Sequence, residues 1–252
     1  MATEKTKKSF KERLADKRKE LASRGGKGNI IFLKDGDKIR VRIYNTGDEK
    51  DFIFEVTQFY LGGELKGVFS PSTFGMPCAL MEKYEELKAS KNKEDKILAK
   101  MLVPRKKNLI LPIIYKDQKG EEVDTEKTGK LIQLGSASQA AEILDHYLDE
   151  EEWGDFMDET DGYDLKLFRT GSGKFDTEYG VTPCKPTKIP REFRGKIADL
   201  EAAVRAVIPS YEETEEALAT FLAAGPEPAE EEDDKDERAA RKARKAKREK
   251  DV

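Results

Sequence analysis

Residues 37-DKIRVRIYN-45 alternate between apolar and polar side chains, and this short stretch decides the class of fold. The apolar set is Ile39, Val41 and Ile43. Basic and aromatic residues fill the positions between them, namely Arg40, Arg42 and Tyr44. Side chains of a β-strand point alternately to opposite faces, so a period of two predicts a strand. The stretch therefore predicts a strand with an apolar core face and a basic, aromatic outer face.

Further strands and helices follow along the chain. Strands are expected at 51–63, 105–117, 130–135, 163–171 and 179–190. Helices are expected within 81–102 (two helices joined by a loop), at 136–152, at 199–208 and at 211–223. Ser136 or Ser138 would cap the helix at 136–152, and Ser210 with Glu213 would form a capping box. Five or six strands between residues 29 and 190, with inserted helices, outline a mainly β, elaborated small barrel.

Charge is distributed unevenly over the 252 residues, whose net charge is −4. Residues 1–27 hold ten Lys/Arg and four Asp/Glu, which gives +6. Residues 225–252 hold nine Lys/Arg and ten Asp/Glu, which gives −1, so residues 28–224 carry −9. Ten carboxylates lie in 145–164 alone, without any Lys or Arg. A uniformly basic body is therefore excluded, whereas a local basic groove is compatible with these numbers.

No run of about 18 apolar residues occurs, so no transmembrane helix is expected. The N-terminal stretch MATEKTKKSFKERL has no apolar region of the kind found in signal peptides. Cys78 and Cys184 are the only cysteines, which indicates a reducing compartment rather than a disulfide framework. We therefore expect a cytoplasmic protein without membrane contact.

Enzyme chemistry finds little support in the sequence. His146 is the only histidine, so a His-based catalytic triad or metal site lacks its partners. The GSGK sequence at 171–174 does not fit a phosphate-binding loop, because Phe168 stands where the first glycine belongs and Phe175 where Ser or Thr should bind magnesium. The carboxylates of 149–164 are interpreted as a solvated acidic surface. We expect no catalytic residue and no cofactor.

Basic and aromatic side chains on the non-core faces of the strands indicate a different role. Proteins that hold single strands without sequence preference use cations to track phosphates and flat side chains to stack on bases. The alternative is that charged residues only solvate the open side of a sheet. Candidate DNA-binding residues are Arg40, Arg42, Tyr44, Phe59, Lys66, Arg105, Lys106, Lys107, Tyr115, Lys166, Phe168, Arg169, Lys174 and Tyr179.

An arm precedes the strands. Residues 3–24 are polar, with Phe10, Leu14 and Leu21 at helical spacing. The arm is either solvated or in contact with a neighbouring subunit or a nucleic acid. Its candidate residues for cooperative binding are Lys7, Lys8, Lys11, Arg13, Lys17, Arg18 and Lys19.

The C-terminal tail contains two runs of opposite charge. Residues 227–237 carry −7 (eight acidic, one basic), and residues 238–250 carry +7 (eight basic, one acidic). An acidic run can occupy a basic groove when DNA is absent, or dock other proteins. The basic run can bind phosphate or pair with the acidic run, and the alternative is a disordered, solubilising tail.

The stretch 69-FSPSTFGMPCALMEKY-84 is spaced like a metal knuckle, but it holds a single cysteine and has no histidine nearby. A structural zinc site needs about four ligands, usually Cys or His. We therefore expect no metal, with Cys78 as a small core residue. Five residues are expected to bury apolar surface in its place: Phe69, Phe74, Met76, Leu80 and Met81.

The order of these segments resembles the helix-destabilising, single-stranded-DNA-binding proteins of tailed phages, the group that includes the T-even phage protein. The resemblance runs from about Gly36 to Ile189, and more loosely to Leu222. Its marks, in chain order, are KIRVRIYN; FIFEVTQFY; a knuckle with Pro71, Thr73, Phe74, Gly75, Pro77 and Cys78; a helical hairpin; RKKNLILPII; KLIQLG with a helix that begins at a serine; and Leu165 to Pro183.

The family is similar to an OB-fold with a zinc-bearing insertion. The positions of its knuckle cysteines are Ser70, Cys78 and Met81 here, and because only Cys78 matches, zinc is not expected. The resemblance divides the chain into an arm at 1–28, a DNA-binding core at 29–190 with an insertion at about 68–104, C-terminal helices at 191–224 and a charged tail at 225–252. The basic ending of the tail departs from the family's acidic pattern.

The resemblance implies a non-enzymatic protein that coats single-stranded DNA in phage replication, recombination and repair, in the cytoplasm of a bacterial host. Self-association along DNA is expected through the arm. Replication proteins (a polymerase, helicase or primase loader) are expected to dock on 227–237. Two alternatives remain: an RNA-binding or transcription cofactor on the same fold, and a replisome docking adaptor with little affinity for nucleic acid.

Overall fold

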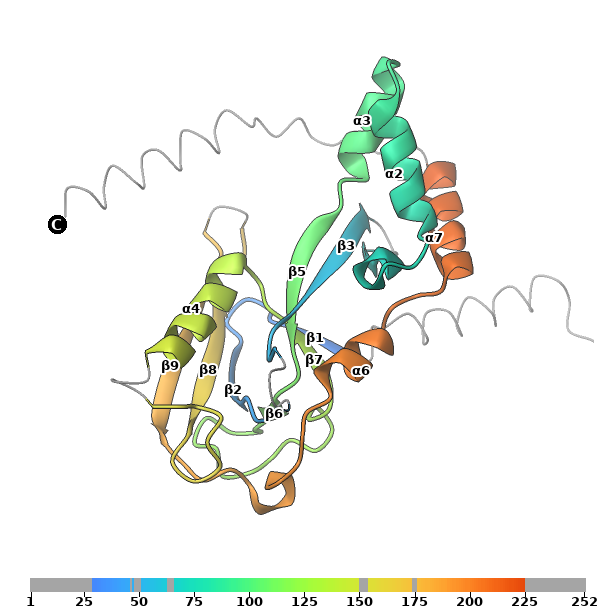
Figure 1. Ribbon diagram of the computed structural model, residues 1–252. Coiled ribbons are helices and arrows are strands. Elements are labelled where there is room, and N and C mark those ends of the chain that lie inside the picture. The colour runs from blue at the N-terminus through green and yellow to red at the C-terminus, as the bar shows by residue number, and fades with distance from the viewer. Residues whose placement is uncertain are drawn as a thin grey trace, which may run out of the picture.

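The computed structural model describes residues 29–45, 47, 51–62, 66–149, 154–173 and 176–224. The arm at 1–28 and the tail at 225–252 therefore lie outside the described residues. Figure 1 shows the helices α2, α3 and α7 together at one end of the molecule, α4 with β8 and β9 at the other, and the long strands β3 and β5 running between them.

Two sheets form the framework. The first, in spatial order, consists of β1 (Ile30–Phe32), β7 (Leu131–Gln133), β5 (Arg105–Ile110), β3 (Phe54–Gly62) and β4 (Lys66–Phe69). The second consists of β6 (Ile113–Ile114), β2 (Lys38–Arg42), β8 (Tyr163–Thr170) and β9 (Glu178–Pro186). All pairings are antiparallel except that of β1 with β7. The expectation of a mainly β fold with inserted helices is confirmed at this level.

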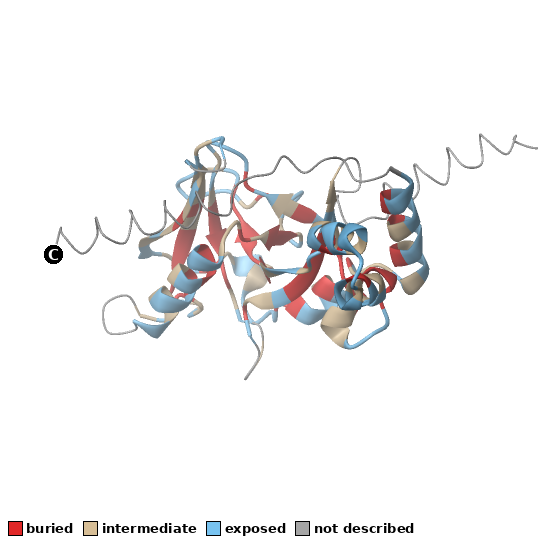
Figure 2. Cartoon of the chain, turned by 90° about the horizontal axis from the view of Figure 1, so that it is seen from above, coloured by how far each residue is buried: buried red, intermediate tan, exposed pale blue. Residues whose placement is uncertain are grey.

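The largest core lies between the two sheets. Val41, Leu165 and Leu167 of the second sheet pack with Ile110 and Ile132 of the first. The helix α4 (Ala137–Leu148) covers this core with Ala140 and Ile143. Its N-cap is Ser136, whose hydroxyl accepts a hydrogen bond from the backbone N–H of Gln139 at 3.1 Å. The apolar residues that alternate along β2 and β8 therefore face the core, as the sequence predicts. Figure 2 shows the buried residues concentrated within the sheets and on the inner sides of the helices.

The expected strand at 105–117 is divided in two. β5 ends at Ile110 and belongs to the first sheet, whereas β6 begins at Ile113 and pairs with β2 of the second. Pro112 stands at the division, and proline cannot donate a backbone hydrogen bond to a sheet ladder. The chain therefore passes from one sheet to the other at this point.

The outer side of the first sheet is covered by α6 (Leu200–Arg205). Leu200 and Val204 pack against Val56, Leu109 and Leu131. A short 3₁₀ turn, η2 (Arg191–Phe193), precedes α6. The Asp199 carboxylate caps the start of α6 by accepting a hydrogen bond from the backbone N–H of Ala202 at 3.0 Å.

The knuckle is held by packing. After the 3₁₀ turn η1 (Pro71–Phe74), Gly75 adopts a left-handed conformation (φ 69°), and Cys78 is buried beside Phe59, Leu80 and Phe221. Five residues were expected to bury apolar surface here. The prediction is wrong for Met76, whose side chain is 43% exposed. The other four pack into the core clusters: Phe69, Phe74, Leu80 and Met81. Over the described residues, no group of three or more Cys, His, Asp or Glu side chains is placed to hold a metal ion.

The insertion consists of α2 (Ala79–Ala89) and α3 (Lys93–Met101), and it is joined to the C-terminal helix α7 (Tyr211–Ala224). The Thr214 hydroxyl of α7 accepts a hydrogen bond from the first backbone N–H of α2, that of Ala79, at 3.2 Å. The predicted capping box of α7 is confirmed, because Ser210 and Glu213 exchange two hydrogen bonds at 2.8 and 3.3 Å. No helix in the described part of the chain is long and apolar enough to cross a bilayer.

Candidate nucleic-acid interface

The two arginines of the opening strand lie inside the molecule, not on an open face. Arg40 is 6% exposed and Arg42 is fully buried. Between them lies Asp164 of β8: Arg40 Nη2 is 2.6 Å from Asp164 Oδ2, and Arg42 Nη1 is 3.2 Å from Asp164 Oδ1. The expectation that these arginines line an exposed face is wrong, because a buried carboxylate on the neighbouring strand draws both guanidinium groups inward.

Neighbouring loops close over this cluster. Arg40 Nη1 donates to the backbone carbonyls of Gln118 and Lys119, and Arg42 Nη2 donates to the carbonyl of Asp158 at 2.7 Å. Glycines at 120 and 162 leave room for the guanidinium groups: a Cβ atom at either position would lie 2.6 Å from Arg40 or Arg42. The cluster contains two guanidinium groups and, among these contacts, one carboxylate. The backbone carbonyls therefore accept hydrogen bonds from the guanidinium charge that the Asp164 carboxylate does not balance.

Tyr115 belongs to the same cluster and is also buried. Its hydroxyl donates to Asp164 Oδ1 at 3.4 Å, and its ring lies 5.7 Å from the Arg40 guanidinium carbon. Burial, and then the charge of Asp164, raise the pKa of Tyr115 well above its ordinary value. Phe59 is fully buried against the knuckle. Both residues were expected on a groove surface, and both are inside the structure.

Three further candidates have partners within the fold. Tyr44 is half-buried and packs edge-on against Phe193, with ring centroids 5.7 Å apart, and burial raises its pKa. Arg169 and Tyr179 pair across β8 and β9, so they share one face of the second sheet. Arg169 Nη1 donates to the carbonyl of Leu33 at 3.0 Å, and the Tyr179 ring lies directly over Gly135. These contacts indicate structural roles for Arg169 and Tyr179.

Lys166 and Phe168 do lie on the outer face of the second sheet, partly exposed. Phe168 pairs with Lys38 of β2 and packs over Gly180 of β9, where a Cβ atom would lie 2.4 Å from the ring. A small surface of one aromatic ring and two lysines results, and Lys38 was not predicted to belong to it. Lys174 lies outside the described residues. Lys66 begins β4, but its side chain is not described.

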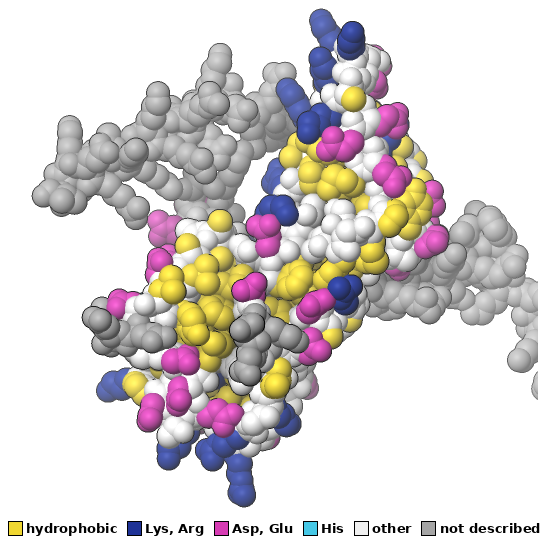
Figure 3. Space-filling model, in the orientation of Figure 1, with side chains coloured by type: hydrophobic (Ala, Val, Ile, Leu, Met, Phe, Trp, Pro, Cys, Tyr) yellow, Lys and Arg dark blue, Asp and Glu magenta, His cyan; other side chains and the backbone are white. Residues whose placement is uncertain are grey.

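A second group of cations follows α3 and the start of β5. Lys93, Lys96 and Lys100 are exposed at positions i, i+3 and i+7 of α3, so they share one side of the helix. Figure 3 shows Lys and Arg side chains following one edge of the molecule from the tip of the helical hairpin toward β5. We call this set the basic edge: Lys93, Lys96, Lys100, Arg105, Lys106 and Lys107.

The β5 members of the basic edge differ in their surroundings. Arg105 is exposed, whereas Lys107 is half-buried, and burial together with the charge of Arg105 lowers the pKa of Lys107. Lys106 forms an exposed ion pair with Glu55 at 3.0 Å. Exposed pairs of this kind contribute little to stability, so Lys106 can exchange Glu55 for another anion at small cost.

Tyr60 is the exposed aromatic residue beside this edge. Its side chain is 57% exposed at the end of β3. Gln58 pairs with Arg105 across the sheet, and alternation places Tyr60 on the same face as Gln58 and Arg105. Tyr60 faces Gly67 of β4, which has no side chain to cover the ring. The sequence offers aromatic residues at both 59 and 60, and the prediction chose the buried one.

Comparison with known proteins identifies the family of this chain. A family model described as "gp32 DNA binding protein like" matches residues 29–222. The chain belongs to this family. Its members are DNA-binding proteins rather than enzymes, and DNA is therefore the partner that membership supports. The match includes both sheets, Tyr60 and the basic edge. A search of curated protein sequences returned no significant match.

The buried cluster leads to a stability prediction. Replacing Asp164 with alanine leaves two buried guanidinium groups without their carboxylate, and removing one partner of a buried ion pair costs about 3–5 kcal/mol. We expect Asp164→Ala to lower the free energy of unfolding by that amount in urea titrations. Asp161→Ala, an exposed aspartate close by, is the control and should change stability by less than about 0.5 kcal/mol. A loss for Asp164→Ala no larger than that of the control would contradict the role given to the cluster.

Proposed function

We propose that this protein coats single-stranded DNA without strong sequence preference, and that the basic edge and Tyr60 form the binding surface. The observation that carries the proposal is an exposed tyrosine, Tyr60, on the same face of the first sheet as the exposed Arg105, where β5 continues from the lysine-bearing helix α3. Single-strand binding needs these two components: cations for the phosphates and an aromatic face for the bases.

The buried arginines strengthen the choice of this surface. Arg40 and Arg42 contact Asp164 and backbone carbonyls, so they are not available to phosphates unless those contacts break. The lysines of α3 have no such constraint from burial. The surface of Lys38, Lys166 and Phe168 is a candidate for a continuation of the DNA path.

The mechanism is binding, without a catalytic step. A protein that binds the unpaired form removes hairpins by mass action. We propose that it acts in phage replication, recombination and repair within the bacterial host cytoplasm, that its two sheets represent an OB-fold-like barrel, and that replication proteins dock on 227–237. Family membership is the support for these assignments.

A salt titration tests the basic edge. Replacing Lys93, Lys96 and Lys100 with alanine should weaken binding to an oligo-dT and make the dependence of log K on log salt shallower by about 2, since each phosphate contact in a single strand contributes roughly 0.7. The control replaces three exposed lysines away from this edge: Lys119, Lys188 and Lys196. Equal effects of the two triple variants would overturn the assignment of the surface.

Absence of oligo-dT binding by the unmodified protein at low salt would overturn the function, and tighter binding to poly-rU than to poly-dT would favour an RNA-binding protein.

Tyr60 gives a separate prediction. Loss of one stacked base costs roughly 1–3 kcal/mol of binding free energy, so Tyr60→Ala should weaken oligo-dT binding by about fivefold to 150-fold, whereas Tyr60→Phe should retain most of the affinity. Phe32→Ala is the matched control, because Phe32 is also about half exposed but lies on β1, at the opposite edge of the first sheet. Fluorescence titration measures all three. Unchanged affinity of Tyr60→Ala would exclude stacking at this position.

Cooperative binding through the N-terminal arm is proposed as well, although the arm lies outside the described residues. Deleting residues 1–24 should abolish clustering on long poly-dT, while binding to an oligonucleotide that holds one protein should weaken only modestly. If the deletion left cooperativity intact, self-association would have to come from the folded part of the chain.

A further inference from the structure

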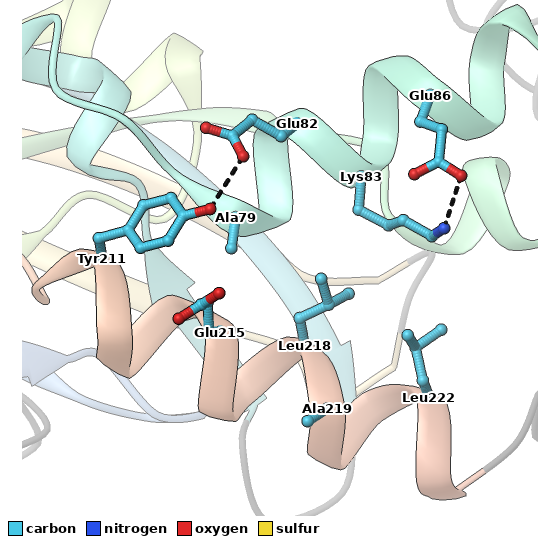
Figure 4. Close-up of a pocket in the computed structure, with 9 residues that line it drawn as sticks. All are labelled: Ala79, Glu82, Lys83, Glu86, Tyr211, Glu215, Leu218, Ala219 and Leu222. Atoms are coloured by element: carbon cyan, nitrogen blue, oxygen red, sulfur yellow. Dashed lines mark hydrogen bonds and ion pairs between the residues drawn. The ribbon is translucent and has the colours of Figure 1, made fainter.

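A groove separates α2 from α7 on the helical end of the molecule, away from the proposed DNA surface. Figure 4 shows Leu218 and Leu222 of α7 directed toward α2 and Ala79 of α2 directed toward α7, and Ala219 of α7 also lines the groove. Leu222 is 42% exposed, although it lies on a helix whose other side packs into the core through Phe221. The groove is therefore an apolar surface left open to solvent.

Carboxylates rim this groove. Glu82 and Glu86 come from α2 and Glu215 from α7, against a single cation, Lys83. Glu82 accepts a hydrogen bond from the Tyr211 hydroxyl at 3.0 Å, and Lys83 pairs with Glu86 at 2.8 Å. The sequence of α7 has four glutamates and neither Lys nor Arg, and α2 has three glutamates and two lysines, so the helix pair carries −5.

We infer that the basic run at 238–250 of the same chain docks in this groove, so that the tail folds back onto the helical end. The run carries +7, which complements the −5 of the helix pair. If it is helical, Ala239, Ala240, Ala243 and Ala246 fall at i, i+1, i+4 and i+7 and form one small apolar side with cations around it. That side matches the apolar residues that line the groove, Ala79, Leu218, Ala219 and Leu222.

The lengths are compatible with docking in the same chain. α7 ends at Ala224, beside Leu222 at one end of the groove. The intervening residues 225–237 can span at most about 45 Å, roughly twice the ~21 Å length of α7, so the run can return along the helix. A run of thirteen residues is about 20 Å long as a helix, close to the length of α7. Tethering also favours the run of the same chain over that of a second copy, because a short linker gives an effective concentration in the millimolar range.

Docking would give the two oppositely charged runs of the tail separate physical roles. The acidic residues 227–237 would form a loop next to α7, and the basic run would be kept away from DNA phosphates. The contact is largely electrostatic, so it should weaken as salt rises.

Disulfide trapping in the full-length protein tests the inference. Cys184 is replaced with serine, and Cys78 stays because it is buried. Cysteines are then placed at Ala219, in the groove, and at Ala243, in the run. We expect an intramolecular cross-link that forms at least about five times faster than in the matched pair Thr220→Cys with Ala243→Cys, since Thr220 is exposed on α7 but turned by about 100° from Ala219.

Two further measurements keep the result decisive. Glu86→Gln with Glu215→Gln, and separately a high salt concentration, should each slow the cross-link at Ala219, whereas neutralising the acidic residues of 227–237 should not. Equal rates at 219 and 220, a cross-link found mainly in dimers, or a rate that depends on 227–237 instead of the groove would each overturn the inference. DNA affinity plays no part in the readout, so the outcome is independent of the proposed function.

Discussion

The arrangement of the second sheet depends on two buried ion pairs, which the Asp164 carboxylate forms with Arg40 and Arg42. It joins β2 to β8 through side chains as well as through the backbone ladder. The same guanidinium groups bind the carbonyls of Gln118, Lys119 and Asp158, so two loops are attached to the sheet at this point. Hydrogen bonds to these carbonyls offset part of the cost of burying the charges, which explains why the loops close over the sheet, while Arg42 Nε stays buried without a hydrogen-bond partner among the described residues.

This cluster also determines where cations remain available to a ligand. Because the cluster holds Arg40, Arg42 and Tyr115 inside the protein, these side chains at the centre of the outer face of the second sheet are not accessible to a ligand. Exposed charge is then found on the basic edge and around Lys38, Lys166 and Phe168. Acidic residues elsewhere in the folded region make the overall charge negative, so recognition of a polyanion has to depend on local surfaces rather than on net charge.

The knuckle is stabilised by contacts with residues that are distant in the sequence. Cys78 and Leu80 are buried against Phe59 and Phe221, and Thr214 caps the start of α2. The C-terminal helix α7 is therefore part of the support for the insertion, and through it for α3 and the lysines on its exposed side. The position of the α3 lysines relative to the β5 members of the basic edge depends on that packing.

By itself, the sequence determined the strand faces that build the core, the helical insertion, the caps at Ser136 and Ser210, and the resemblance to single-stranded-DNA-binding proteins. Periodicity and capping are local properties, and the order of segments is visible without coordinates. Only the tertiary structure decided that Arg42 is inside, that Tyr60 rather than Phe59 is exposed, and that Arg169 contacts the carbonyl of Leu33. Each of these outcomes depends on a residue far away in the sequence, such as Asp164, Cys78 or Leu33. Alternation separates the two faces of a strand, but strand pairing and the loops packed above decide which face meets water.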